Sequence, residues 1–424
     1  MSRETIRKIT PVGTIDAVVR VPPSKSYTNR ALIVTALADG ASKLVDASNS
    51  DDSEYLIRAL RQFGVTIERN HDGVGVQGTS GKISAPSEEV FVGNAGTAMR
   101  FLTTFASLAE GISIVTGDEQ MQRRPLGDLL EALHAAGIKS SSNNGCPPVK
   151  IHGGNFTGGR VDIRGSVSSQ FVSSILLSSP YAKHPVTLCV QKKLISLPYV
   201  DMTLHVMRSF GAKVDAFDSS VFAVSNADRY VGQTFRIEGD ATCATYFLAA
   251  AAILQGRAVI SNLSGDSLQG DLKFLPVLAE MGCRITHHGE SVELQGGKLF
   301  GVEVDMNEMP DCVPTLAVIA AFAKGPTTIL NIAHLRFKET DRIRALAKEL
   351  SKIGAQVDVF DEGITIHPGN LRGATIETYN DHRMAMSFAV AGLRIAGIGI
   401  ENPTCVSKSF PNFWEVFGKI ENKD

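Results

Sequence analysis

The 424-residue sequence lacks several features by which proteins are often classified. It contains six cysteines but no Cys-x-x-Cys pair, so neither a zinc knuckle nor a dithiol redox motif is indicated, and we expect buried thiols in a reducing cytosol. Its 42 basic and 44 acidic residues give a net charge of −2. The excess of Lys and Arg that is typical of proteins binding nucleic acids or anionic membranes is therefore missing.

Signals for export or membrane insertion are also missing. The first eight residues, MSRETIRK, hold no apolar stretch of the kind found in secretory signals, and the acidic Glu4 is unusual for a transit peptide. The longest apolar run, from Tyr246 to Leu254, is about half of the roughly 20 residues that span a bilayer. We therefore expect a cytoplasmic protein, and we interpret this run as a buried helix.

Motifs for nucleotides and metals are absent or misplaced. No Gly-x-x-x-x-Gly-Lys-Ser/Thr sequence occurs, so an ATP-dependent kinase loses support. The segment Gly73 to Gly78 matches the dinucleotide fingerprint, but it falls in a predicted β-hairpin rather than between a strand and a helix. No His or Cys cluster has ligand spacing, and His287 and His288 are expected to be exposed in a hairpin. We expect neither a metal ion nor an organic cofactor.

What the sequence does contain is an internal repeat. A helix ending in an apolar residue and Gly, followed by alternating apolar positions, recurs at intervals of 73, 74, 71 and 72 residues. A second feature recurs between these glycines: a helix of small residues ends and a strand begins, at intervals of 71, 73, 72, 69 and 72 residues. The helix ends mostly at Gly, whose freedom at positive φ suits the end of a helix. The glycines of the first feature are Gly64, Gly137, Gly211, Gly282 and Gly354. The residues at which the helices of the second feature end are Gly40, Gly111, His184, Gly256, Gly325 and Gly397.

Each repeat unit is interpreted as a buried helix, a strand, an amphipathic helix and two further strands. A sixth helix ending in an apolar residue and Gly ends at Gly418, and no hairpin follows it. We expect the N-terminal strand to supply this missing hairpin. The alternation of helices and strands predicts an α/β fold, and the chain length favours two domains of roughly 200 residues each.

Polar residues gather where the buried helices are predicted to begin. Pro22-Pro23-Ser24-Lys25 leads into a helix on which Ser26 and Arg30 are one turn apart, and a helix N-terminus bearing cations is a natural anion site. In the segment from Gly93 to Thr97, glycine lets backbone N–H groups approach a ligand, as in a phosphate loop without its lysine. An ordinary capped helix with surface charges is the alternative in each case.

The other helix starts carry similar groups. Arginine and lysine at a helix N-terminus oppose the helix dipole unless an anion compensates them, so these groups indicate an anionic ligand. Glu339 and Arg342, three residues apart, are expected to share a helical face. The groups are Arg123-Arg124-Pro125, Ser168-Ser169-Gln170, Ser196 with Tyr199, Asp311, Lys338 to Arg342, Asp381-His382-Arg383, and Lys408.

Taken in order, these motifs resemble those of the 5-enolpyruvylshikimate-3-phosphate synthase family of enolpyruvyl transferases. The resemblance covers essentially the whole chain. It implies transfer of the enolpyruvyl group of phosphoenolpyruvate to the 5-hydroxyl of shikimate 3-phosphate, with release of phosphate through a tetrahedral intermediate, in the pathway to chorismate and the aromatic amino acids. The matching motifs are Pro23-Ser24-Lys25-Ser26 with Arg30, Gly93 to Arg100, Arg124-Pro125, Lys338 to Arg342, and Asp381 to Met386.

The resemblance also implies an architecture. Two inside-out α/β barrel domains would be built from six βαβαββ repeats, three in each domain. One domain would combine residues 1–20 and 240–424, and the other would comprise residues 21–239, with the active site in the cleft between them. A monomer that binds only these small molecules is expected.

The site residues of the family carry over onto matching positions. Shikimate 3-phosphate would be held by Lys25, Ser26, Arg30, Ser168, Ser169, Gln170, Ser196, Tyr199, Asp311 and Lys338. Phosphoenolpyruvate would meet Lys25, Asn94, Gly96, Arg124, Gln170, Arg342, Arg383 and Lys408. Since arginine stays protonated, the candidates for proton transfer are Lys25, Asp311, Glu339 and His382. Of these, we assign Glu339 to the methylene carbon of phosphoenolpyruvate and Asp311 to the hydroxyl.

Two departures and two alternatives accompany the resemblance. His334 stands where Asn is common, and Phe101 where bacterial members often have Pro, which leaves open the sensitivity to glyphosate-like inhibitors. The related UDP-N-acetylglucosamine enolpyruvyl transferases carry a cysteine five residues before an Arg-Pro pair, where this chain has Glu119. A noncatalytic sugar-phosphate-binding protein is the second alternative, and Asp311 and Glu339 argue against it because acids near the ligand weaken anion binding.

Overall fold

A computed structural model describes residues 6–71 and 73–421, so residues 1–5, where a secretion signal would begin, lie outside the described part. Contacts divide the chain into two compact units, each with its own hydrophobic core. Unit 1 comprises the chain up to Pro22 and from Gly239 onward, and unit 2 is Pro23–Glu238. Both units mix helices with strands, so the predicted α/β class is confirmed. Within the described ranges, no helix combines the length and apolar character needed to cross a membrane.

Unit 2 contains the elements between the two crossings of the chain. Its helices are α1 (Lys25–Leu37), α2 (Asp51–Gln62), α3 (Gly96–Phe105), α4 (Gly127–Ala135), α5 (Ser169–Ser178) and α6 (Pro198–Ser209). Its strands are β3 (Ala41–Val45), β4 (Thr66–Asn70), β5 (Gly73–Gln77), β6 (Val90–Phe91), β7 (Gly111–Thr116), β8 (Lys139–Asn143), β9 (Cys146–Gly153), β10 (Gly159–Arg164), β11 (Val186–Gln191), β12 (Val214–Ala216), β13 (Val221–Val224) and β14 (Thr234–Arg236).

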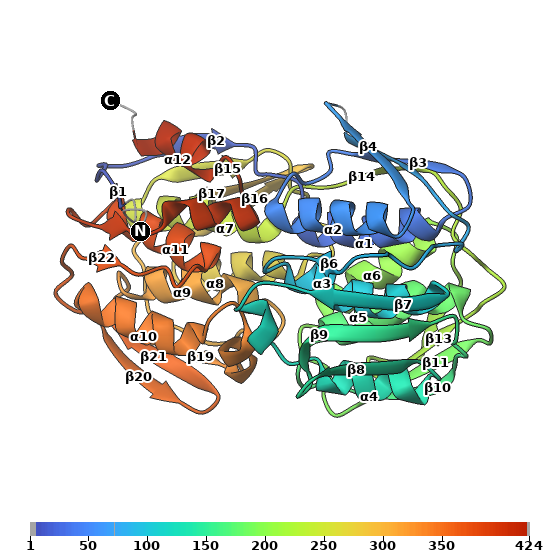
Figure 1. Ribbon diagram of the computed structural model, residues 1–424. Helices are drawn as coiled ribbons and strands as arrows, with labels where there is room; N and C mark the ends of the chain where they lie inside the picture. The colour runs from blue at the N-terminus through green and yellow to red at the C-terminus, as the bar shows by residue number, and fades with distance from the viewer. Residues whose placement is uncertain (1–5, 72, 422–424) are drawn as a thin grey trace. The chain divides into compact units, whose positions relative to one another are not determined.

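Unit 1 is built from both ends of the chain. Its helices are α7 (Ala241–Leu254), α8 (Phe274–Glu280), α9 (Val313–Ala320), α10 (Arg342–Lys352), α11 (His382–Gly392) and α12 (Phe413–Glu421). Its strands are β1 (Arg7–Lys8), β2 (Asp16–Val19), β15 (Arg257–Ile260), β16 (Arg284–His288), β17 (Ser291–Gln295), β18 (Glu303–Asp305), β19 (Thr327–Leu330), β20 (Gln356–Phe360), β21 (Gly363–His367), β22 (Thr375–Ile376) and β23 (Gly399–Ile400). In Figure 1 the blue strands β1 and β2 accordingly lie among yellow and red elements.

The described strands form six small sheets, and one pattern recurs in them. In the sheet β6-β7-β9-β8, β7 pairs in parallel with β6, while β9 pairs antiparallel with both β7 and β8. The sheets β10-β11-β13-β12, β14-β3-β5-β4, β18-β19-β21-β20 and β2-β15-β17-β16 have the same order. In the sixth sheet, β22 and β23 are parallel, and the N-terminal β1 is the antiparallel neighbour of β23.

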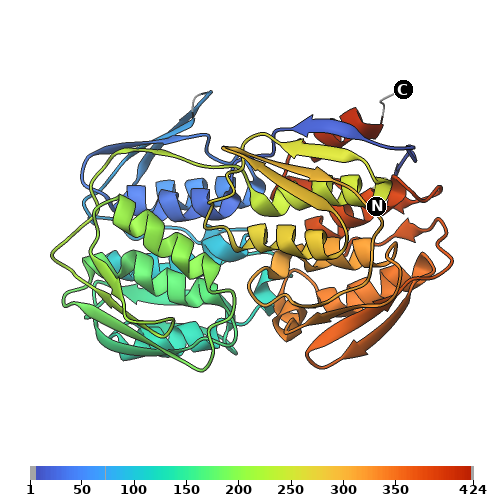
Figure 2. The ribbon, with the colours of Figure 1, turned by 180° about the vertical axis from the view of Figure 1, so that it is seen from behind.

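Some helices are buried on all sides and lie inside the units. Every residue of α3, α7 and α11 is buried, whereas α2 and α10 bury one face. In unit 2, α3 packs against α5 behind the sheet β6-β7-β9-β8 in the view of Figure 1, and Figure 2 shows the same unit from behind. The prediction that the run ending at Leu254 is a buried helix is confirmed. The prediction that the cysteines are buried is wrong for Cys146 and Cys405, which are only partly buried, and holds for the other four. His287 and His288 are exposed on β16, and Gly73 begins the second strand of a hairpin, as predicted.

The prediction that a glycine with a positive φ ends the repeated helix is wrong for Gly256, after α7. Gly40 and Gly325 have φ of +84° and +93°, as expected of glycine at a helix end. After α7, however, Gln255 takes the left-handed conformation with φ +53°, and Gly256 does not. A Cβ at Gly256 would lie 2.3 Å from the carbonyl oxygen of Ile15. Glycine is therefore needed there for close contact with the N-terminal segment rather than for ending the helix.

Candidate active site

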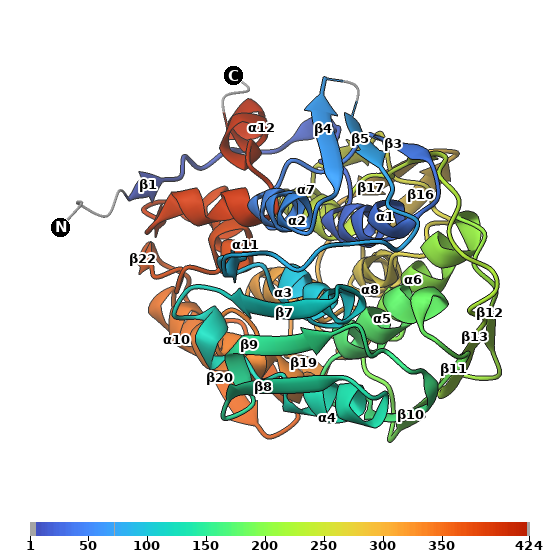
Figure 3. The ribbon, with the colours of Figure 1, turned by 45° about the vertical axis from the view of Figure 1, so that its right-hand side comes forward.

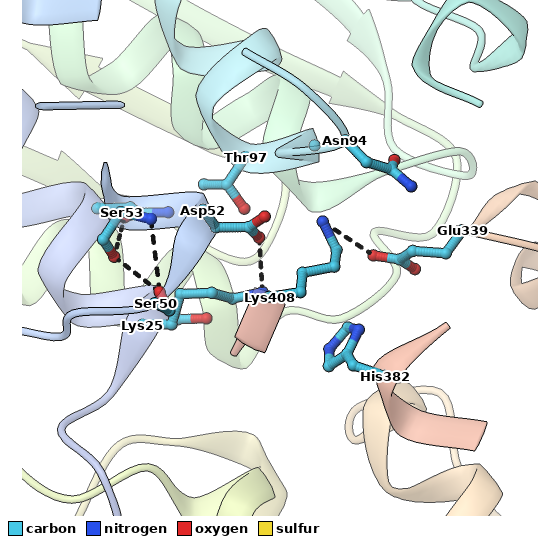
Figure 4. A network of polar contacts seen from close by, with 12 residues as sticks. Lys25, Ser50, Asp52, Ser53, Asn94, Thr97, Glu339, His382 and Lys408 are labelled. Carbon is cyan, nitrogen blue, oxygen red and sulfur yellow. Dashed lines mark hydrogen bonds and ion pairs between the residues drawn. The ribbon is translucent and has the colours of Figure 1, made fainter. Parts of the chain in front are cut away.

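Lys25 is the first residue of α1 and lies in a polar network of unit 2. The hydroxyl of Ser24 caps the helix by accepting the Tyr27 N–H at 3.4 Å. The ammonium of Lys25 donates to the buried carboxylate of Asp52 at 2.9 Å, as Figure 4 shows. A buried ion pair fixes both partners, because separating them would leave a desolvated charge. Lys25 is thus held in place at a helix N-terminus.

Asp52 was not predicted as a site residue. It lies in the first turn of α2, where the hydroxyl of Ser50 caps the helix by accepting the Ser53 N–H at 3.4 Å. The Ser50 and Ser53 hydroxyls are also bonded, at 3.1 Å. The sequence Ser50-Asp51-Asp52 signals a helix start by its acids and cap. It does not indicate that Asp52 pairs with Lys25.

Arg30 is buried and connects α1 to α6. Its Nε donates to the Thr203 hydroxyl at 2.8 Å, and its Nη1 and Nη2 donate to the carbonyl oxygens of Ser26 and Tyr199 at 2.9 and 2.8 Å. Burial lowers the pKa of the guanidinium to about 10. Its carbon Cζ lies 5.5 Å from the ring centroid of Phe101, so Phe101 supplies an aromatic face to the cation.

Gly96 is the first residue of α3 and lies beside two arginines. The Nη1 of Arg100 donates to the Gly96 carbonyl at 3.1 Å, and the Nη1 of Arg124 donates to the Asn94 side chain at 3.4 Å. A Cβ at Gly96 would lie 2.8 Å from the Nη1 of Arg124 and 2.9 Å from that of Arg100. Glycine therefore leaves room for two guanidinium groups at a helix N-terminus, where an anion is also favoured.

The predicted serines and Gln170 lie at two further helix starts of unit 2. Ser168 caps α5 by accepting the Gln170 N–H at 3.3 Å, and the Gln170 amide donates to the Thr97 hydroxyl at 3.4 Å. Ser196 has φ +53° and accepts the Tyr199 N–H, so it forms the turn before α6. Gln170 thus connects the starts of α5 and α3.

In unit 1, Arg342 contacts three carboxylates. It begins α10 and is almost fully buried. Its Nε donates to Asp381 at 2.8 Å, its Nη1 to Asp311 at 2.9 Å and its Nη2 to Glu339 at 2.7 Å. Burial alone would lower the pKa of this guanidinium, but Asp381, Glu339 and Asp311 outweigh burial and raise it. These four residues form what we call the Arg342 cluster.

Asp311 connects the Arg342 cluster to Arg383. The Nη2 of Arg383 donates to the Asp311 carboxylate at 2.6 Å. Burial would raise the pKa of Asp311, but the charges of Arg383, Lys338 and Arg342 dominate and hold it well below its usual range. Asp311 is therefore ionised, and in this arrangement it is a weak base.

Glu339 lies between two cations. Besides Arg342, it faces the ammonium of Lys408 at 3.9 Å, and Figure 4 shows this pair with His382 at the start of α11. The Nδ1 of His382 lies 3.6 Å from Asp381. The prediction that Glu339 and Arg342 share a helical face is wrong, because α10 begins only at Arg342. Glu339 reaches Arg342 from the preceding loop.

His334 is buried in the 3₁₀ turn Ala333–Phe337 of unit 1. Burial and the nearby charge of Lys338 lower its pKa to about 3, so the ring is neutral at physiological pH. Its Nε2 has no hydrogen-bond partner within the described ranges. A neutral imidazole is able to donate or accept one hydrogen bond there, as an asparagine would.

A buried pair beside this site was also missed. Cys312 donates its thiol hydrogen to Asp271 with sulfur and oxygen 3.0 Å apart. Burial, and then the charge of Asp311, raise the pKa of Asp271 to about 6. Nothing in the local sequence signals the contact, because the two residues come from different 3₁₀ turns, Gly270–Lys273 and Pro310–Cys312.

We expect Asp271→Asn to stabilise the protein more at pH 8 than at pH 5. Because the folded-state pKa lies above that of an exposed aspartate, the folded state loses stability as pH rises from about 4 to about 6 and Asp271 must ionise. Asparagine keeps an acceptor for the Cys312 thiol and never ionises. The gain in unfolding free energy should be about 1–2 kcal/mol larger at pH 8 than at pH 5. Urea unfolding at both pH values measures it, and an equal gain would contradict it.

Comparisons with known proteins identify relatives over nearly the whole chain. The sequence model of the EPSP synthase (3-phosphoshikimate 1-carboxyvinyltransferase) family matches residues 9–417. A 3-phosphoshikimate 1-carboxyvinyltransferase of Methanospirillum hungatei is 45% identical over 407 residues, 94% of each chain, and one of a Marinomonas species is 41% identical over 418 residues, 97% of this chain and 98% of the other. The solved EPSP synthase of Acinetobacter baumannii is similar with a TM-score of 0.82 and 27% identity, covering 99% of this chain and 98% of that one.

Proposed function

The chain belongs to the EPSP synthase (3-phosphoshikimate 1-carboxyvinyltransferase) family, and we propose how its residues carry out the reaction of that family. The enzyme transfers the enolpyruvyl group of phosphoenolpyruvate to shikimate 3-phosphate in the shikimate pathway of aromatic amino acid biosynthesis. The observation that carries the site assignment is the Arg342 cluster with Arg383 and Lys408. Cations and carboxylates together suit a ligand that is both an anion and a proton acceptor.

Binding requires many cations, because the two substrates together carry two phosphates and two carboxylates. Arginine grips such oxyanions with two parallel hydrogen bonds, and lysine with a point charge. We assign phosphoenolpyruvate to Lys25, Asn94, Gly96, Arg124, Gln170, Arg342, Arg383 and Lys408. We assign shikimate 3-phosphate to Lys25, Ser26, Arg30, Ser168, Ser169, Gln170, Ser196, Tyr199, Asp311 and Lys338. An active site in a cleft between the domains stays a prediction.

The reaction needs an acid that later acts as a base. A proton is added to the methylene carbon of phosphoenolpyruvate, and the shikimate 5-hydroxyl attacks the neighbouring carbon as it loses its own proton. The tetrahedral adduct then expels phosphate and returns the methyl proton. We propose that Glu339 gives and takes back the carbon-bound proton, and that Asp311 accepts the hydroxyl proton. Lys25 and His382 are the remaining candidates for these roles.

Substrate binding would prepare both carboxylates for proton transfer. Arg342, Arg383 and Lys408 are paired with Asp311 and Glu339 before any anion binds. An incoming phosphate or carboxylate competes for the same N–H donors and compensates the same charges. Each carboxylate then loses part of the stabilisation that lowers its basicity. The acids of this site therefore have a purpose that a simple anion receptor would not require.

Release of phosphate from phosphoenolpyruvate tests the function directly. We expect release that depends on shikimate 3-phosphate and none with phosphoenolpyruvate alone, because the hydroxyl attack precedes loss of phosphate. Mass analysis should show one enolpyruvyl ether of shikimate 3-phosphate for each phosphate released. The assignment would be contradicted if phosphate release did not depend on shikimate 3-phosphate. It would also be contradicted if UDP-N-acetylglucosamine served as the acceptor instead of shikimate 3-phosphate.

Three expectations from the sequence remain proposals. We propose a cytoplasmic location, supported by the absence of disulfides among the six cysteines, all of which lie in the described part of the chain. A monomeric state is proposed as well, and sedimentation of the purified protein tests it. Catalysis without a metal ion or organic cofactor also stays a prediction.

A further inference from the structure

Two consecutive residues before α11 have an unusual backbone conformation. Tyr379 and Asn380, between β22 and α11, both have φ +54°. The left-handed region is unfavourable for residues with a side chain, most of all for a bulky one such as tyrosine. Such conformations persist only where surrounding contacts hold them, and they often occur at functional sites. The contacts around this pair show what it connects.

On one side, Tyr379 is bonded to α10 through a buried carboxylate. The Tyr379 hydroxyl donates to Glu349 at 2.6 Å, and the backbone N–H of Glu377 donates to the other Glu349 oxygen at 3.1 Å. The side chain of Glu349 is fully buried, and Lys352 pairs with it at 2.6 Å. Burial and this hydrogen bond raise the pKa of Tyr379, so its hydroxyl stays a donor. Because α10 begins with Arg342, the contact attaches the left-handed pair to the helix that presents Arg342.

On the other side, Asn380 is bonded to the segment that presents Lys408. The amide of Asn402 donates to the Asn380 side chain at 3.1 Å. Asn402 has φ +44° and directly precedes the 3₁₀ helix Pro403–Lys408. The contact therefore attaches the same pair to the element that ends with Lys408.

The pair also leads directly into Asp381. This residue caps α11 by accepting the Arg383 N–H at 2.9 Å, and its other oxygen accepts from the Nε of Arg342 at 2.8 Å. In the views of Figures 1 and 3, β22 lies above α10 in unit 1. The dipeptide Tyr379-Asn380 is therefore connected to three elements, α10, α11 and the 3₁₀ helix Pro403–Lys408. Each of these elements presents one cation of the site.

We infer that Tyr379 and Asn380 form a positioning junction, which sets Arg342, Arg383 and Lys408 at the spacing that phosphoenolpyruvate requires. Glu349 and Asn402 are positioning residues that act through this junction. The inference rests on the proposed role of the three cations. It assigns a functional purpose to the left-handed backbone, since a relaxed loop would leave each cation on an independently moving element.

Two variants loosen the junction from opposite sides. Tyr379→Phe removes the hydroxyl bond to Glu349, and Asn402→Gly removes the amide bond while keeping a residue suited to φ +44°. The KM for phosphoenolpyruvate should rise about three- to tenfold in Tyr379→Phe, as the loss of one partly buried hydrogen bond predicts, and by a smaller factor in Asn402→Gly, whose bond is exposed. In both variants the KM for shikimate 3-phosphate should change less than about twofold. Initial rates with each substrate varied in turn measure both constants.

Tyr230→Phe is the control for Tyr379→Phe, because it likewise removes one tyrosine hydroxyl bond, here the buried bond to the Leu177 carbonyl at 2.9 Å in unit 2. It should lower Tm without changing either KM. Unchanged KM values for phosphoenolpyruvate in both junction variants would overturn the inference, whatever their Tm. Arg383→Gln checks the premise separately. If Arg383→Gln also leaves the KM for phosphoenolpyruvate unchanged, both the assignment of the cations to phosphoenolpyruvate and the positioning junction are wrong.

Discussion

Replacing Glu339 by glutamine is expected to lower kcat by about 100-fold or more, the usual contribution of a positioned general acid and base. Glutamine keeps the size of the side chain and one acceptor oxygen but has no exchangeable acid. Glu339 faces Arg342 at 2.7 Å and Lys408 at 3.9 Å, so it is placed among the cations assigned to phosphoenolpyruvate. Steady-state kinetics should show the loss mainly in kcat, with a smaller change in the two KM values.

A second measurement separates proton transfer from a disturbed cation cluster. The glutamine amide would place N–H donors against Arg342 or Lys408, which alone could raise the KM for phosphoenolpyruvate. Incorporation of deuterium from D₂O into the methylene group of phosphoenolpyruvate reports the carbon protonation itself. It should fall in parallel with kcat in Glu339→Gln and remain in Tyr230→Phe. Near-normal kcat and deuterium incorporation would transfer the role to Lys25 or His382.

Much of the fold could be predicted from sequence because its signals are local and periodic. Glycine at regular intervals, and Ser or Asp ahead of apolar segments, indicate where helices end and begin, and the α/β class follows from their alternation. Ser24, Ser168 and Asp381 do cap α1, α5 and α11. Periodicity does not decide which residue takes a strained conformation, however. At the end of α7, contact with Ile15 requires glycine at position 256, so Gln255 takes the positive φ instead.

The candidate site was only partly predictable, because its contacts are made between elements far apart in the sequence. The sequence shows cations and acids at helix starts but not their pairing. Lys25 meets Asp52 on another helix, and Arg342 meets carboxylates from three different segments. The position of Glu339 was misjudged for a local reason. Asp341 caps α10 by accepting the Arg344 N–H at 3.1 Å, so the helix begins after Glu339 rather than before it.

Gly96→Ala is expected to raise the KM for phosphoenolpyruvate about 10- to 100-fold, as the loss of charge-assisted hydrogen bonds from an arginine predicts. A Cβ there would lie 2.8 Å from the Nη1 of Arg124 and 2.9 Å from that of Arg100, closer than nonbonded atoms approach. The backbone of α3 is fixed by its helical hydrogen bonds, so the guanidinium groups must move. The KM for shikimate 3-phosphate should change much less, because its assigned residues lie on other helix starts.

The matched control for this substitution is Gly127→Ala. Gly127 is also the first residue of a helix in unit 2, but a Cβ there would meet no atom within 4 Å. Both substitutions reduce the conformational freedom of the unfolded chain equally, so a difference between them reports the crowding at Arg124. Gly127→Ala should leave both KM values unchanged. Equal increases of the two KM values in Gly96→Ala would contradict the placement of phosphoenolpyruvate beside Arg124, because displacement of that guanidinium acts on one substrate only.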